Sequence, residues 1–76
     1  MSAAETPETE CTIELNGLPK VVASGTTIAA LVSMVLREPR AYAVELNRAV
    51  VARRDHATTC VRAGDRVEIV TLVGGG

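Results

Sequence analysis

Apolar and polar residues alternate where the patterned part of the chain begins, and this alternation predicts a β-hairpin. The run 11–15 has the period of a half-buried strand. Asn16-Gly17 follows, a pair suited to the positive φ angles of a tight hairpin turn. Residues 20–23 then form the returning strand, where Pro19 is tolerated at the first position or on a sheet edge. The side chains expected to face inward from the first strand are Cys11, Ile13 and Leu15.

A longer period replaces this alternation from residue 28 and predicts a helix. Residues 24–27 end the hairpin and offer a hydroxyl group that can cap the helix start. Apolar side chains then recur at the spacing of one helix face. Pro39 is expected to stop the helix, because the residue before a proline is pushed out of the α region. The stripe expected to face the core is Ile28, Leu31, Val32, Val35 and Leu36.

Strand patterns return after the helix. The run 42–46 alternates again and predicts a third strand, with Tyr42, Val44 and Leu46 on one face. Asn47-Arg48 begins a turn, and residues 49–52 are expected to form a short fourth strand. No period is usable at 53–59, which we expect to be a loop or a short helical turn.

The last patterned run, 66–73, follows a turn at 63–65 and predicts a final strand. Its alternation assigns two faces. One face is expected to carry Val67, Ile69 and Thr71, and the other Glu68, Val70 and Leu72.

These elements predict an α+β domain with one main helix packed on one face of a mixed, four- to five-stranded sheet. The patterns leave the strand order open. A length of 76 residues allows one small domain. Residues 1–9 carry no apolar pattern and are expected to be a disordered leader. The domain is then expected at 10–73, with a flexible glycine tail at 74–76.

Charge and composition argue against two classes of partner. The net charge is −1, three acidic residues lie among the first ten, and Tyr42 is the only aromatic residue. The remaining chain has eight basic and six acidic residues, too balanced for the basic patch typical of nucleic-acid binders. The longest apolar run, 28–36, is far shorter than the ~20 residues of a membrane span. No secretory signal is visible, so we expect a cytoplasmic protein that binds neither nucleic acid nor membrane.

Cysteine and histidine do not suggest a catalytic or metal site. Cys11 shares the predicted core face, so a buried structural thiol is expected there. Cys60 is expected to be partly exposed, with no His, Lys or helix N-terminus placed to activate its thiol. His56 and Cys60 supply one short-spaced pair, whereas structural zinc needs four ligands. We therefore expect no metal, no disulfide and no catalytic activity in the chain alone.

Three glycines, Gly74, Gly75 and Gly76, directly follow the predicted final strand. Glycine makes up about 7% of residues on average, so three in succession are improbable by chance. Without Cβ atoms they form a thin thread that can enter a narrow channel with the α-carboxylate leading. A carboxylate becomes reactive toward nucleophiles when ATP converts it to an acyl-adenylate. The tail therefore predicts a substrate for the active site of another protein.

Four motifs resemble the ThiS family of sulfur carrier proteins. They are IELNG at 13–17, TTIAALVSMV at 26–35, AVELN with VVARR around 43–54, and AGDRVEIVTLVGGG at 63–76. The resemblance covers the chain from about Thr12 to Gly76. It implies a ubiquitin-like β-grasp fold, with the final strand between the first and the third and parallel to the first. It also implies a role in building the thiazole ring of thiamine.

The resemblance assigns the residues of the tail to steps of sulfur transfer. Gly76 matches the residue whose carboxylate is adenylated by a ThiF-type adenylyltransferase using ATP and magnesium. Conversion to a thiocarboxylate, with sulfur from a donor of the cysteine desulfurase type, would prepare it for thiazole synthase. Gly75 and Gly74 would thread into the partner's site. Partner contact is expected at Val70, Leu72 and Val73, unless Val70 and Leu72 are ordinary exposed apolar residues. No cofactor is expected on this chain itself.

Three other functions share parts of this pattern. The chain could be the small subunit of molybdopterin synthase, or a ubiquitin-like modifier conjugated to lysines. It could also be a small binding module with an inert tail. The VELN and VEIVTLVGGG segments favour the thiazole branch. Mass spectrometry after incubation with an activating enzyme separates these functions, since a carrier gains sulfur, a modifier forms an isopeptide and a binding module does neither.

Overall fold

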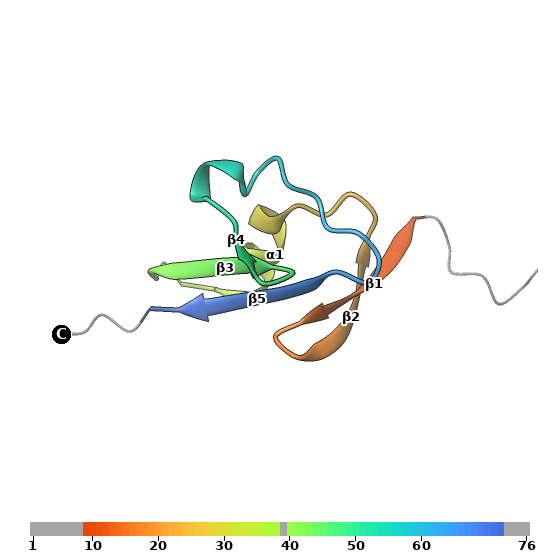
Figure 1. Cartoon of the computed structure of the whole chain (residues 1–76), viewed down its shortest axis with the longest axis horizontal. Helices are drawn as coiled ribbons and strands as arrows, with labels where there is room; N and C mark the ends of the chain where they lie inside the picture. Colours follow the sequence, from red (N-terminus) through yellow and green to blue (C-terminus); the bar gives the residue numbers. More distant parts are fainter. Residues whose placement is uncertain (1–8, 39, 73–76) are drawn as a thin grey trace, which may run out of the picture.

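The computed structural model describes residues 9–38 and 40–72, which form a five-stranded mixed sheet with one helix on one face (Figure 1). The strand order is β2-β1-β5-β3-β4. β5 pairs in parallel with β1 and antiparallel with β3. This arrangement confirms the predicted α+β, β-grasp class and the position of the final strand. The elements are β1 (Glu10–Leu15), β2 (Leu18–Ala23), α1 (Ile28–Val35), β3 (Tyr42–Leu46), β4 (Ala49–Val50), the 3-10 helix η1 (Arg53–Asp55) and β5 (Arg66–Thr71).

The first hairpin forms as its sequence predicts. Asn16 and Gly17 have φ angles of 50° and 86°, the left-handed backbone that a two-residue turn requires. The returning strand begins at Leu18, two residues earlier than expected, and β2 lies at the sheet edge, where Pro19 removes no ladder bond from a central strand. At the start of the described chain, the Thr9 carbonyl accepts a hydrogen bond from Ser24 N at 2.8 Å. The rest of the predicted leader, residues 1–8, lies outside the described residues.

The Asn16 side chain extends the pairing between β1 and β5. Only two residue pairs, Glu14–Arg66 and Leu15–Val67, join these parallel strands directly. Beyond them, Asn16 N donates to Val67 O at 2.9 Å, and Asn16 Oδ1 accepts from Ile69 N at 2.8 Å. The turn residue thus continues the ladder with its own side chain.

The second two-residue turn, Asn47-Arg48, holds the start of β5. Asn47 N donates to Arg66 O at 2.7 Å, and Arg66 N donates to Asn47 Oδ1 at 2.9 Å. Asn47 Nδ2 donates to Asp65 Oδ1 at 3.1 Å, while Asp65 Oδ2 accepts from Arg62 N at 2.8 Å. Asp65 therefore acts in turn formation, as its place beside Gly64 predicts.

Helix α1 has the expected start and an earlier end. Thr27 is the N-cap, and its Oγ1 accepts from Ala30 N at 3.1 Å. The helix ends at Val35, and Leu36 has an extended backbone although its N–H still donates to Val32 O at 2.8 Å. The chain thus leaves the helix before Pro39, which itself lies outside the described residues. Of the predicted stripe, Ile28, Leu31 and Val32 are buried and Leu36 packs against the core, but Val35 is 36% exposed.

The segment between β4 and β5 closes over the start of α1. Ile28 N donates to Thr59 O and Ala29 N donates to His56 O, each at 2.9 Å. Together with the Thr27 cap, these bonds satisfy the first amides of the helix, which have no partner within it. His56 Nε2 donates to Val51 O at 3.0 Å and so fixes the segment from inside. The region predicted as loop or short helical turn therefore contains η1 and a buried histidine.

The core lies between α1 and the sheet. It is aliphatic apart from one thiol, and the polar residues Thr26 and His56 are also buried. His56 comes from the segment 53–59, which has no usable hydrophobic period. Most of the other core residues come from the predicted strands and the predicted helix. The fourth strand is shorter than expected, because it ends at Val50. The buried apolar residues are Cys11, Ile13, Val22, Ile28, Leu31, Val32, Val44, Val61, Val67 and Ile69.

Replacing Leu31 with Ala is expected to destabilise the domain strongly. Leu31 is fully buried, so truncation leaves a cavity that costs about 2–5 kcal/mol. Small domains have a total stability of about 5–15 kcal/mol, so the variant should unfold at much lower urea. Met34→Ala is the matched control, because Met34 is on the same helix but 51% exposed. Equal urea midpoints for the two variants would contradict this view of the helix face.

Asn16→Gly is expected to cost about 1–3 kcal/mol, because it leaves Ile69 N without its side-chain acceptor. Glycine accepts the positive φ at this position, so the loss reports the hydrogen bond rather than turn strain. Asn16→Asp keeps an acceptor oxygen and should remain closer to the wild type in equilibrium unfolding. If glycine and aspartate variants are equally stable, the Asn16–Ile69 bond contributes nothing.

Candidate functional site

The site is built on β5, whose last residue is Thr71 (Figure 1). Leu72 follows and stays tied to the neighbouring segment, since its N–H donates to Ala41 O at 2.8 Å. The chain therefore leaves the sheet from a fixed position between the helix-covered face and the open face. Val73, Gly74, Gly75 and Gly76 lie outside the described residues, and the roles predicted for them stay predictions.

The alternation along β5 separates a core face from an open face. Val67 and Ile69 are buried, whereas Val70 is 49% exposed and Leu72 is 53% exposed. This confirms the predicted direction of Val70 and Leu72, although partner contact there stays a prediction. Thr71 was expected on the core face but is exposed. It lines an open hollow beyond the end of α1, where the helix no longer covers the sheet.

The open face changes character along β5. Near the tail, Val70 lies opposite Ala43 of β3. Two residue pairs further from the tail, the carboxylates Glu68 and Glu45 lie directly opposite each other, an arrangement that like charges make unfavourable. Further along the strand, Arg66 Nε is 3.0 Å from Glu14 Oε2. The open face thus has apolar residues beside the tail and charged residues behind them.

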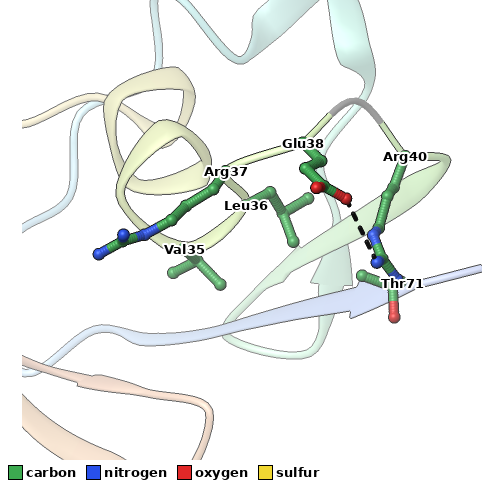
Figure 2. A pocket seen from close by; sticks show the side chains of 6 residues that line it. All are labelled: Val35, Leu36, Arg37, Glu38, Arg40 and Thr71. Atoms are coloured by element: carbon green, nitrogen blue, oxygen red, sulfur yellow. Dashed lines mark ion pairs between the residues drawn. The ribbon is translucent and has the colours of Figure 1, made fainter.

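The helix-covered side has a hollow of about 300 Å³ beside the root of the tail (Figure 2). Its apolar lining comes from the end of α1, and Arg37, Glu38 and Arg40 follow in the segment before β3. Arg40 Nη2 is 3.7 Å from Glu38 Oε2. No function was predicted for these arginines from the sequence. The one signal in the sequence is that Arg37 and Arg40 lie three residues apart, on either side of Pro39.

The two cysteines and His56 lie in different surroundings. Cys11 is buried in the core, as predicted, and Cys60 is exposed, and both are free thiols. They line a common hollow of about 420 Å³, together with Ser24 and Gly25 of the turn after β2. Within residues 9–38 and 40–72, no three His, Cys, Asp or Glu side chains gather closely enough to hold a metal ion. In the same part of the chain, no helix has the length and apolar character to cross a membrane.

The fold and the sequence are similar to those of known proteins. A crystal structure of the thiamine biosynthesis protein ThiS from Geobacter metallireducens superposes with a TM-score of 0.72 at 32% sequence identity. That match covers 86% of this chain and 99% of the other. Two proteins named thiazole synthase are also similar in sequence. The one from Magnetococcus marinus is 38% identical over 64 residues, and the one from Paramagnetospirillum magneticum is 34% identical over 62 residues.

The two thiazole synthases are much longer than the aligned region. The match covers 84% of this chain in the first case and 82% in the second, but the chain spans only about a fifth of either relative. The model of the ThiS family matches residues 9–76, which include every strand of the sheet and the glycine tail. The chain therefore belongs to the ThiS family of small sulfur carrier proteins.

Proposed function

We propose that this chain carries sulfur as a thiocarboxylate at Gly76 and delivers it for thiazole formation in thiamine biosynthesis. The observation that carries the proposal is the family match through Gly76, on a fold whose central strand leads directly to the glycines. The chain is a substrate in this proposal, and the catalytic groups belong to its partners.

Carboxyl activation explains why a partner is needed. A carboxylate is a poor electrophile because its negative charge repels nucleophiles. In the proposed reaction, a Gly76 carboxylate oxygen attacks the α-phosphorus of ATP and releases pyrophosphate. The outer sulfur of a persulfide on the donor then displaces AMP from the acyl-adenylate and forms an acyl disulfide. A second thiol attacks the donor sulfur of that disulfide, which releases the thiocarboxylate and leaves a new disulfide between the two thiols. A ThiF-type adenylyltransferase would bind the ATP and magnesium, and a cysteine desulfurase type of donor would supply the sulfur.

Chain geometry suits delivery into such a site. Four residues beyond Leu72 extend at most about 14 Å, since each residue spans about 3.5 Å. Because Gly74, Gly75 and Gly76 have no side chains, this part of the chain is narrow enough to enter a confined active site. The fixed position of Leu72 beside Ala41 gives the thread a defined starting point.

Thiazole synthase is the proposed recipient of the sulfur. Segments similar to this chain form about a fifth of two proteins named thiazole synthase, which supports a functional link between the two activities. The small subunit of molybdopterin synthase and a lysine-conjugated modifier use a similar tail and are the alternative functions. A binding module with an inert tail is the alternative from a different class.

The sulfur should be carried at the C-terminus and not on a cysteine. A Cys11→Ser, Cys60→Ser variant is expected to gain sulfur to the same stoichiometry as the wild type. The sample is incubated with a ThiF-type adenylyltransferase, ATP, magnesium and a sulfur donor, and its intact mass is measured. The added mass should equal one oxygen replaced by sulfur and should map to the C-terminal peptide. Added thiazole synthase and its substrates should reverse the change.

Length variants provide the control for this experiment. Deletion of Gly76 moves the carboxylate back by one residue, about 3.5 Å, and should abolish loading. One residue added after Gly76 should have the same effect, by displacing the carboxylate from the reaction centre. Normal loading of either variant, or lost loading in the cysteine-free one, would overturn the proposed chemistry. An isopeptide product would indicate a modifier instead.

The exposed apolar side chains of β5 should contribute to binding of the activating enzyme. Val70→Asp and Leu72→Asp are each expected to raise the dissociation constant about tenfold or more, equivalent to about 1.4 kcal/mol. A carboxylate placed in a desolvated contact without a partner is costly, whereas on an open surface it is nearly neutral. Both side chains are half-exposed, so melting temperatures should change little. Val21→Asp on edge strand β2 is the control, and equal binding by all three variants would place the contact elsewhere.

A further inference from the structure

Three arginines, Arg37, Arg40 and Arg53, line two adjacent hollows near the end of β5. We call this surface the arginine groove. Arg37 and Arg40 follow α1, and Arg53 belongs to η1. The first hollow, of about 300 Å³, adjoins a second of about 350 Å³, and both are lined by Leu36, Arg37, Glu38 and Arg40. Segments separated by more than ten residues thus bring their positive charges to one concave surface.

The groove has a positive charge although the whole chain is negative. It contains three of the eight basic residues and one acidic residue, Glu38, while the chain has a net charge of −1. The Glu38–Arg40 pair is 3.7 Å apart, with side chains 76% and 60% exposed, so it is weak and readily exchanged. Within residues 9–38 and 40–72, neither Arg37 nor Arg53 forms an ion pair.

The directions of the guanidinium groups indicate the shape of the ligand. Figure 2 shows the Arg37 side chain extending past the end of the helix and the Arg40 side chain extending toward Thr71, in a different direction, with Leu36 between them. Arg53 lies over the Tyr42 ring, 4.7 Å from its centroid, at the second hollow. Groups that diverge in this way cannot converge on one small anion such as phosphate. They can contact several carboxylates spread along an extended segment, with Val35 and Leu36 as its apolar support.

We propose that the arginine groove binds an acidic segment of the protein that activates the tail. This inference rests on the proposed function. The groove reaches Thr71, the last residue of β5, so a partner that holds the tail lies close to it. Carboxylates on the partner would pair with Arg37, Arg40 and Arg53, accelerate the encounter and fix the direction in which the tail enters. A basic partner surface does not fit, because like charges repel. A nucleic acid fits less well, because Tyr42, the one Phe, Trp or Tyr of the chain, already lies against Arg53 and is not free to stack on a base.

Charge reversal tests this proposal. Arg37→Glu with Arg40→Glu is compared with Lys20→Glu with Arg62→Glu, which changes net charge equally at exposed sites outside the groove. The dissociation constant for a ThiF-type adenylyltransferase is measured at about 0.1 M and about 1 M salt, where the Debye length is about 10 Å and about 3 Å. The groove pair should weaken binding at least about tenfold at low salt, chiefly by slowing association, and much less at high salt. The control pair should change it less than about threefold.

Three outcomes would overturn the proposal: equal weakening by both pairs, unchanged binding by the groove pair, or a loss that high salt does not reduce. Arg37→Gln with Arg40→Gln is the milder pair should the double reversal unfold, and it should weaken binding in the same salt-dependent way. Binding of a fluorescent RNA oligonucleotide that depends on the groove, with unchanged enzyme binding, would assign the groove to nucleic acid.

Tail loading of the wild type is measured in parallel. Its absence would refute the proposed function, whereas normal loading with unchanged groove-variant binding refutes only the groove.

Discussion

The position of β5 between β1 and β3 is the constraint on which the rest of the structure depends. Its parallel pairing with β1 extends over only two residue pairs, so strand hydrogen bonds alone hold it weakly on that side. Two turn asparagines complete the attachment. Asn16 accepts from Ile69 N on one side, and Asn47 accepts from Arg66 N on the other. Each asparagine also adopts the positive φ of its turn, so one residue serves both chain reversal and strand pairing.

Fixing β5 determines both surfaces beside the tail. With Val67 and Ile69 held in the core, strand alternation turns Val70 to the open face and brings Thr71 to the hollow at the end of α1. A one-residue slip of β5 would exchange these faces and expose the core valine. The early end of α1 has a similar effect, because it uncovers Val35 and leaves space for the arginine groove.

Local patterns were sufficient for the elements and insufficient for their assembly. Alternation and the Asn16-Gly17 pair predicted the first hairpin, because these signals act within a few residues. The strand order depends on contacts between β1 and β5, which are about fifty residues apart, and it came only from family resemblance. Burial of His56 was missed, since residues 53–59 have no usable period and are held by the amides at the start of α1. Val61 lies between that segment and the turn at 63–65 and was assigned to no element, although it is buried. Val35 was misassigned because it is the last residue of α1, where the apolar spacing still fits one helix face but the side chain is no longer covered by the core.

The net charge of the chain did not predict how charged residues are distributed around the end of β5. A value of −1 argues against a strongly charged surface, yet the fold places Arg37, Arg40 and Arg53 on the helix side of the tail. On the opposite face, Glu45 and Glu68 lie side by side. The charges named here are therefore positive on the helix side and negative on the open face. A partner with one charged flank experiences attraction on one side and repulsion on the other, which favours a single orientation of approach. For a tail without side chains, that orientation has to come from the folded domain, because glycines offer no side-chain contacts that distinguish one direction of entry from another.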